Sequence, residues 1–237
     1  MIDLLDVCDT PRLFGDRPNL LTRATFSLPR GRYALLSGSP EVHRALLDVI
    51  TGLRPPRRGC VCHAGLVSWP IGRQGFARGR AYGIRMIELV CDLYGIAVRP
   101  AIDFVGDLLS SPQYLTRPME HWPQYVRQEF SFALGLVPAF DLYVIDGAIP
   151  HEPCRFTRLW QALFEERLVG RALILSTYRQ NQMADYCTKG LIYENESFRI
   201  DGDLDRCIAR YPARQSRADT GGGYEDGGGY VDGGFGV

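Results

Sequence analysis

The sequence predicts an α/β fold in which a parallel sheet lies between layers of helices. Two short runs, Leu142 to Ile145 and Ala172 to Leu175, are continuously apolar, which is typical of parallel strands buried on both faces. The segment from Phe156 to Leu168 lies between them and is expected to be a helical crossover of right-handed connection. Because a chain of 237 residues can bury one sizeable core, we expect a single main domain.

The region before these strands predicts an antiparallel β element and a helix. Residues 1–35 alternate short β-like runs with Pro and Gly turns, as in a small antiparallel element that leads into a buried strand. Arg44 to Leu53 is predicted to be helical, because its leucine, valine and isoleucine residues form one apolar stripe. Gly52 and the prolines at 55 and 56 are expected to end that helix, and residues 66–69 to form a strand.

Three further helices, a hairpin and a glycine-rich tail complete the expected elements. The helices are predicted at residues 81–94, 101–110 and 124–136, the hairpin at 191–200 and a last short helix at 204–211. Residues 214–237 contain too little side chain to offset the entropy lost on ordering, so we expect a flexible tail. Its aromatic residues, Tyr224, Tyr230 and Phe235, leave open a weak contact with a partner.

Composition and charge narrow the classes of function. Lys and Arg together equal Asp and Glu at 27 each, so no net field favours nucleic acid or an anionic membrane surface. Arginines such as Arg73 are expected to form a solvated rim. The sequence has no apolar run long enough to cross a membrane and no signal-peptide pattern, so we expect a cytoplasmic protein that reaches the membrane only through a partner.

The cysteines predict a reducing compartment and no metal site. There are seven, an odd number with irregular spacing, which argues against a disulfide framework. Cys60-x-Cys62-His63 offers three side chains of metal-ligating type, but a fourth ligand at zinc-site spacing is missing.

Several stretches together resemble the ATP-binding subunits of capsular-polysaccharide ABC exporters. They are Ser68-Trp69-Pro70-Ile71-Gly72, the segment ending Asp92-Leu93-Tyr94-Gly95, and Phe132-Ala133-Leu134 through Phe140 to Asp146. The resemblance covers about residues 1–211. It implies a P-loop NTPase-like, RecA-like ABC nucleotide-binding domain over residues 1–213, with an N-terminal antiparallel β element and a helical subdomain near residues 80–135.

The segment that resembles the family's P-loop has lost the residues that bind phosphate and Mg²⁺. A P-loop needs G-x-x-x-x-G-K-[ST], in which Lys contacts the β- and γ-phosphates and the hydroxyl holds Mg²⁺. Here His43 stands at the lysine position and Arg44 at the hydroxyl position. We expect Ser39 to cap a helix that Pro40 begins, with Glu41 in its first turn taking the field a phosphate would use. Ser39, His43 and Arg44 are thus the remaining candidates for contacting nucleotide.

The other catalytic positions implied by the resemblance also carry different residues. Asp146 remains of the Walker B motif, but Gly147 stands where the catalytic glutamate is expected and Thr177 where the switch histidine is expected. The signature-motif glycine falls on Tyr125, and the D-loop aspartate falls on Pro153. A lone Asp at a strand end is also compatible with a structural hydrogen bond. These losses predict a pseudo-ATPase that needs no cofactor and has no catalytic residue.

The leading hypothesis is therefore a non-hydrolysing ABC-type subunit of a polysaccharide or capsule exporter, peripheral at the inner face of the cell membrane. The resemblance implies an integral membrane permease and an intact ABC ATPase subunit as partners. Bulky residues near the former site are expected to form the contact with that subunit: Arg44, Trp122, Tyr125 and Tyr178. Alternatively, they merely fill an unused cleft.

Two other functions stay open from the sequence. The chain could be a divergent but active ATPase that binds ATP and Mg²⁺ through His43, Arg44 and Asp146. It could also be a free-standing regulator or scaffold with an ABC fold.

Overall fold

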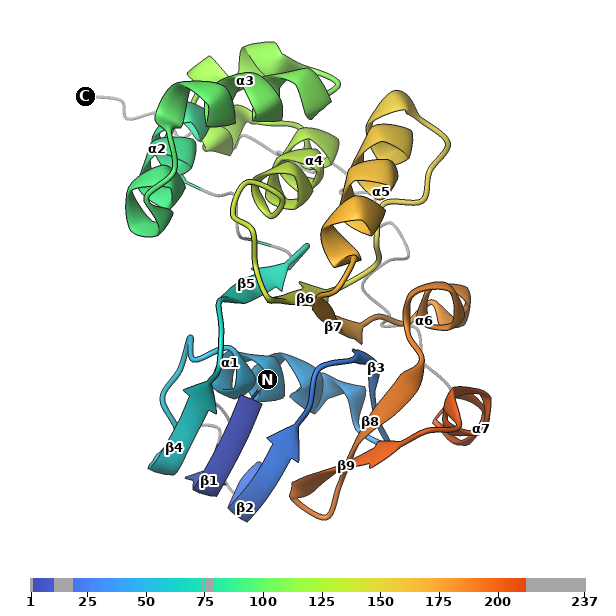
Figure 1. The fold of residues 1–237 in the computed structure, drawn as a ribbon. Helices are drawn as coiled ribbons and strands as arrows, with labels where there is room; N and C mark the ends of the chain where they lie inside the picture. The colour runs from blue at the N-terminus through green and yellow to red at the C-terminus, as the bar shows by residue number, and fades with distance from the viewer. Residues whose placement is uncertain (1, 11–18, 74, 76–78, 212–237) are drawn as a thin grey trace, which may run out of the picture.

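Two β-sheets and a group of helices make up the computed structural model, which describes residues 2–10, 19–73, 75 and 79–211 (Figure 1). The tail predicted for residues 214–237 lies outside the described residues. The smaller sheet is antiparallel, with the order β2 (Leu21–Leu28), β1 (Ile2–Asp9) and β4 (Arg58–His63). The antiparallel element expected near the N-terminus is therefore present, and β4 joins it from later in the chain.

The larger sheet carries the strands that the sequence predicts to be buried. Its order is β5 (Val67–Ile71), β6 (Leu142–Asp146), β7 (Ala172–Ser176), β3 (Arg32–Ser37), β8 (Lys189–Glu194) and β9 (Ser197–Asp201). The first five strands run parallel, and β9 closes the edge as an antiparallel hairpin strand. All of β7 and the first four residues of β6 are buried, which confirms that both strands are covered on both faces.

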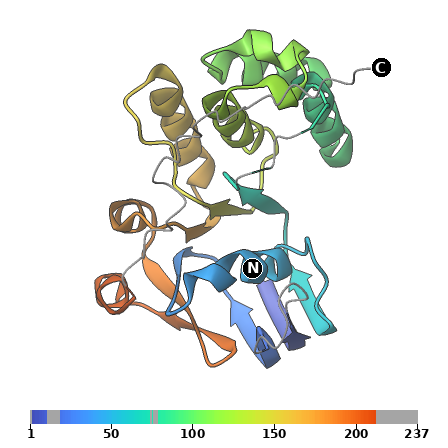
Figure 2. The ribbon, with the colours of Figure 1, turned by 180° about the vertical axis from the view of Figure 1, so that it is seen from behind.

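The helices lie on both sides of this sheet. On one side, α1 (His43–Ile50) packs between the mixed and antiparallel sheets, as Figures 1 and 2 show from opposite directions. On the other side lie α2 (Gly83–Tyr94), α3 (Val98–Leu108), α4 (Gln124–Leu134) and α5 (Arg155–Leu168). The short helices α6 (Gln180–Tyr186) and α7 (Leu204–Arg210) flank β8, and 3₁₀ turns occur at Pro40–Val42, Pro112–Thr116 and Met119–His121. The predicted helix 44–53 is shorter at its end, because Gly52 adopts a left-handed φ of 75°.

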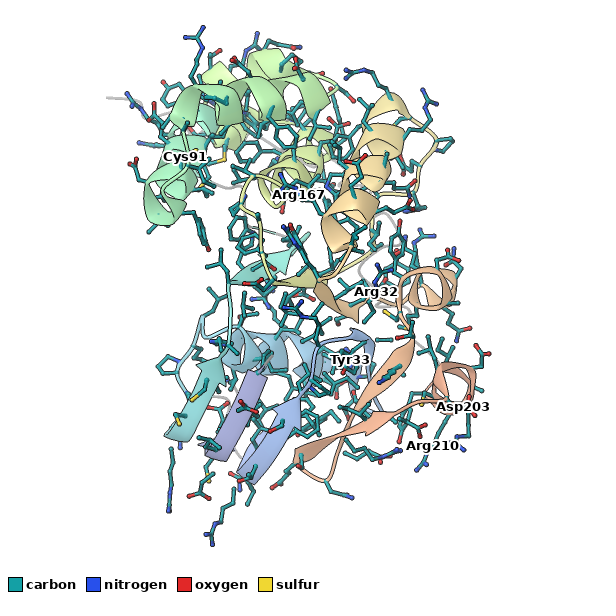
Figure 3. All side chains as sticks on the ribbon, in the orientation of Figure 1. Arg32, Tyr33, Cys91, Arg167, Asp203 and Arg210 are labelled. Carbon is teal, nitrogen blue, oxygen red and sulfur yellow. The ribbon has the colours of Figure 1, made fainter. Side chains whose placement is uncertain are left out.

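Two hydrophobic clusters separate along the mixed sheet. One joins α2 to α5 with the sheet, and the other joins α1 with the antiparallel sheet. Cys91 on α2 and Tyr33 on β3, both labelled in Figure 3, belong to the first and the second cluster respectively. Each strand of the parallel sheet contributes side chains to both clusters, and polar side chains lie mainly at the strand ends.

Trp122 lies inside the first cluster, which corrects its predicted place in a contact surface. Its side chain is 1% exposed, and its ring meets Phe130 edge to face with centroids 5.1 Å apart. The indole Nε1–H donates to the Arg117 carbonyl oxygen at 2.9 Å, so its polar atom is also satisfied internally. A side chain held in this way anchors α4 and cannot reach a partner.

Replacing Trp122 with alanine should therefore destabilise the protein. We expect Trp122→Ala to lower the free energy of unfolding by about 3–5 kcal/mol, because it leaves a cavity under α4. Tyr125→Ala is the matched control, since Tyr125 is 50% exposed and its loss should cost no more than about 0.5 kcal/mol. Urea denaturation of both variants measures the difference, and a Trp122→Ala protein as stable as the control would contradict the core assignment.

Candidate functional site

A pocket of about 660 Å³ lies where β3, β6 and β7 end. Parallel strands bring their carboxyl ends to one edge of a sheet, and this is where ligands bind in open α/β folds. The pocket brings together most of the residues that the sequence singled out: Ser39, His43, Arg44, Asp146, Gly147, Thr177 and Tyr178. Tyr125 is not among its lining residues. It lies in the first turn of α4, where its hydroxyl is 3.2 Å from that of Ser111.

The segment at the position expected for a P-loop contains a short 3₁₀ helix, Pro40–Val42. Pro40 begins this helix, as predicted, and the Val42 N–H donates to the Ser39 carbonyl oxygen at 3.1 Å. The prediction that the Ser39 side chain caps the helix is wrong, because Ser39 has a ψ of 78° and makes no side-chain cap bond. Its own N–H instead donates to Ser37 Oγ at 3.2 Å. Glu41 is exposed at the mouth of the pocket.

His43 uses both ring nitrogens to join two strand ends. Its Nε2 lies 2.8 Å from Ser37 Oγ on β3, and its Nδ1 lies 3.1 Å from Ser176 Oγ on β7. In a neutral imidazole one nitrogen donates and the other accepts, and serine hydroxyls can take either role. The side chain at the former lysine position is therefore fully bonded within the protein.

The surroundings of His43 also keep it uncharged. Burial lowers the pKa of His43 from its usual 6.5 to about 4, although the nearby carboxylate of Glu41 acts in the opposite direction. At pH 7 only about one molecule in a thousand would carry the imidazolium charge at such a pKa. At neutral pH His43 is thus a neutral hydrogen-bonding group rather than a cation.

Asp146 at the end of β6 is paired with Arg73. The Arg73 Nε donates to Asp146 Oδ2 at 2.7 Å, while Nη1 of the same guanidinium donates to Asp48 of α1. The side chains of Arg73 and Asp146 are only 14% and 18% exposed. Burial acts to lower the pKa of Arg73, but the hydrogen bonds that its guanidinium donates to Asp48 and Asp146 raise this pKa above its ordinary value. Arg73 is therefore part of the site, and the expectation of a solvated rim is wrong for this residue.

Gly147 has a backbone conformation that a glutamate would strain. Its φ is 128°, and its N–H donates to the Ser176 carbonyl oxygen at 2.8 Å. Residues with a Cβ rarely adopt this φ. The position is therefore adapted to glycine, and no side chain follows Asp146 into the pocket from it.

The segment after β7 is held to the segment after β6. Thr177 Oγ1 accepts from the Arg179 N–H at 3.2 Å, and the Arg179 guanidinium lies 5.4 Å from the Tyr178 ring centroid. The buried amide of Gln182 both donates to the carbonyl and accepts from the N–H of Ile149, at 2.8 and 2.9 Å. The polar side chains of Thr177 and Gln182 thus stabilise the backbone of these two segments.

The sequence analysis missed four residues that shape the site: Ser37, Asp48, Arg73 and Ser176. Some signals were available, because both serines end buried apolar strands and Arg73 directly follows the Ser-Trp-Pro-Ile-Gly segment. No local pattern, however, pairs Arg73 with carboxylates that lie 25 residues before and 73 residues after it.

The architecture and this site can be compared with known proteins. The chain aligns over 85% of its length with a dimeric structure of the ATP-binding cassette MJ0796 bound to ADP and Pi, with a TM-score of 0.65 and 12% identity. It aligns over 92% of its length with the ATP-binding subunit of an ABC transporter, with a TM-score of 0.63 and 17% identity. The alignments span 98% and 96% of those chains. The fold is that of an ABC ATP-binding cassette domain.

Proteins with similar sequences are also ATP-binding proteins, and some of their names refer to polysaccharide export. The ATP-binding protein BexA of Haemophilus influenzae is 24% identical over 91% of this chain and 100% of its own length. The capsule polysaccharide export ATP-binding protein CtrD of Neisseria meningitidis is 25% identical over 79% of this chain and 87% of its own. The polysialic acid transport ATP-binding protein KpsT of Escherichia coli is 23% identical over 82% and 88%. Homologues of this cassette domain are thus capsule and polysaccharide export ATP-binding proteins, as the sequence motifs indicate.

No family model matches the chain. In the part of the chain that the structure describes, no helix is both long enough and apolar enough to cross a membrane.

The neutral state of His43 predicts a specific loss of stability in acid. A folded pKa near 4 and an ordinary value of 6.5 mean that the unfolded chain binds the extra proton between these pH values. Stability from this residue is present above pH 6.5 and is lost as the pH falls towards 4. From pH 7 to 4.5 we expect a loss of about 2 kcal/mol from His43.

Urea denaturation at the two pH values tests this with His43→Gln, which keeps a donor and an acceptor but does not titrate. His121→Gln is the control, because the His121 side chain is 71% exposed. We expect only the first variant to reduce the pH dependence. Equal pH dependence in wild type and His43→Gln would contradict the shift.

Proposed function

We propose that this chain is a non-hydrolysing ABC-type subunit of a polysaccharide export transporter. The single observation that carries the proposal is the internal pairing of both charge-handling positions, His43 with two serines and Asp146 with Arg73. An ABC ATPase needs a cation for the phosphates and a free carboxylate near Mg²⁺. Here the cation position holds the neutral side chain of His43, and the carboxylate of Asp146 is paired with Arg73.

Electrostatics argue against a nucleotide in this pocket. ATP brings several negative charges, and without the lysine and Mg²⁺ they would face Glu41 and Asp146, which both line the pocket. Arg73 cannot compensate, because its guanidinium is already shared between the carboxylates of Asp146 and Asp48. Mg²⁺ could bind Asp146 only by displacing that guanidinium, and separating a buried ion pair costs several kcal/mol. Arg44 remains as an exposed cation at the rim of the pocket.

Hydrolysis has a second obstacle at Gly147. The attacking water in this chemistry is oriented by a residue close to the γ-phosphate. Gly147 supplies no such side chain, and its φ of 128° disfavours any residue that could. The alternative of a divergent but active ATPase would need another group for this role.

The transporter assignment rests on the homologues. CtrD and KpsT are named for export of capsule polysaccharide and transport of polysialic acid. We infer from them a membrane permease partner and a cytoplasmic position at the inner face of the membrane. We also infer that residues 1–213 form the domain that makes these contacts, while an intact ATPase subunit supplies the catalysis.

Nucleotide titration of the full chain tests the non-hydrolysing state directly. We expect calorimetry with ATP or ADP to stay flat up to millimolar nucleotide, with and without Mg²⁺, because neither charge-handling position is available. Arg73→Ala is an informative companion. It frees Asp146 but leaves His43 in place, so we expect no nucleotide binding from it either.

Two other results would argue against a non-hydrolysing subunit. A Mg²⁺-dependent dissociation constant below about 100 µM, which corresponds to roughly −5.5 kcal/mol, would contradict the proposal. ATP turnover that disappears in Asp146→Ala would identify the chain as the divergent ATPase.

Three of the four residues predicted to contact a partner remain at least partly exposed once Trp122 is excluded: Arg44 and Tyr178 line the pocket, and Tyr125 lies on α4 apart from the pocket lining. Arg44 and Tyr125 are exposed, and Tyr178 is half-buried at the pocket wall. Arginine and tyrosine are frequent in the energetic centres of interfaces. Since we expect no ATP to bridge two domains here, side chains of this kind would have to provide the affinity for the intact subunit.

Co-purification with a neighbouring ATPase subunit and permease measures this contact. We expect the wild type to elute with them, and Arg44→Ala/Tyr125→Ala to lose most of the association while keeping its thermal midpoint. Trp122→Phe is the control for a nearby aromatic that does not reach the surface. A wild-type chain that elutes alone would favour a free-standing regulator, and an unaffected double variant would exclude this surface.

A further inference from the structure

Two thiols project from the same face of β4. Cys60 and Cys62 are two residues apart in an extended strand, so their side chains point in the same direction. Both residues are exposed, and their sulfur atoms are 3.9 Å apart. Two free thiols this close together are chemically distinct from the other cysteines of the described chain, and the proposed transport function does not use them.

The separation of the two sulfurs suits a bridging metal ion. With a Zn–S bond of about 2.3 Å, a sulfur separation of 3.9 Å gives an S–Zn–S angle of about 116°, close to tetrahedral. A disulfide fits less well. Residues two apart in a strand have Cα atoms about 6.6 Å apart, near the upper limit for a disulfide, and parallel Cβ directions. The strand therefore presents two ligands that could hold an ion without moving its backbone.

The described residues of one chain do not complete such a site. His63 points to the other face of β4, where its Nε2–H donates to the Ile50 carbonyl oxygen at 2.6 Å. Among the described residues, no group of three or more His, Cys, Asp or Glu side chains could hold a metal ion. A closed zinc site needs four ligands, so it would need two more than the described residues of one chain supply here.

The position of β4 offers a way to supply them. β4 is the outer strand of the antiparallel sheet, with the order β2-β1-β4, and Figure 1 shows it at the border of the molecule. An outer strand has backbone groups available for pairing with another strand. Antiparallel pairing of β4 with its own copy about Val61 would place Cys60 opposite Cys62 of the partner subunit. All four thiols would then lie on one face, with opposite Cβ atoms about 4.5–5.5 Å apart.

We propose that Cys60 and Cys62 form half of a binding site for a thiophilic divalent cation such as Zn²⁺, and that a second copy of this chain completes it. The resulting site would lie on a two-fold axis and have four cysteine ligands, a ligand set that structural zinc commonly uses. Charge does not oppose the association, since the chain has a formal net charge of zero and Arg58 on β4 is paired with Asp6 at 3.1 Å. The site joins two antiparallel sheets into one and is independent of the nucleotide pocket.

Metal titration of the reduced full-length protein tests this site. Co²⁺ is the optical probe, because thiolate ligation gives a charge-transfer band, and sedimentation measures the mass. We expect one Zn²⁺ per two chains, a doubling of mass on Zn²⁺ addition, and reversal of both by EDTA. Cys60→Ser/Cys62→Ser should abolish the band and the dimer while its thermal midpoint stays unchanged, because both side chains are exposed.

The matched control is Cys8→Ser/Cys154→Ser, which removes the other two cysteines that are not buried. We expect this control to bind Co²⁺ and dimerise as the wild type does. Zn²⁺ uptake that persists without Cys60 and Cys62 would overturn the proposal. So would one Zn²⁺ per chain with no change in mass, or a dimer that thiol reductant dissociates and EDTA does not.

Discussion

The burial of β6 and β7 on both faces is the constraint on which the rest of the structure depends. Every residue of β7 is buried, and four of five residues in β6 are buried. Such strands need a hydrophobic layer above and below, and the two clusters built on α1 and on α2 to α5 provide these layers. Polar side chains are excluded from the strands themselves and gather where the strands end.

That arrangement creates a concentration of polar groups which must satisfy one another. Ser37 and Ser176 end β3 and β7, and the imidazole of His43 bridges them. Asp146 ends β6, and Arg73 neutralises it while also reaching Asp48 on α1. In an ABC ATPase this edge of the sheet keeps its cation and its carboxylate available for nucleotide and Mg²⁺. In this chain the His43 and Asp146 side chains at the same edge are instead bonded to Ser37, Ser176 and Arg73.

The two surfaces proposed for association lie on different parts of the fold and would be held by different kinds of interaction. One proposed surface consists of Arg44 and Tyr178 at the pocket and Tyr125 on α4, whose planar groups can form contacts with a partner of the same fold. The β4 edge offers backbone pairing and two thiols, and it requires a metal ion to complete its ligands. Because β4 belongs to the antiparallel sheet, a contact there leaves the carboxyl ends of the parallel strands uncovered.

Local sequence patterns determine some features of this protein, and tertiary packing determines others. The parallel strands and the crossover helix follow from the sequence, and so does the presence of His43, Gly147 and Thr177 at the positions that the motif spacing marks, because apolar runs and motif spacings are properties of short segments. Trp122, Arg73 and His63 show what those segments leave open. Whether Trp122 faces solvent depends on Phe130 and Arg117 around it, and the charge of Arg73 is matched by carboxylates from two distant elements. His63 follows two exposed thiols in sequence, yet strand alternation turns it to the other face. Side-chain direction and long-range ion pairing are decided by how the elements pack, since the partners meet only in the folded chain.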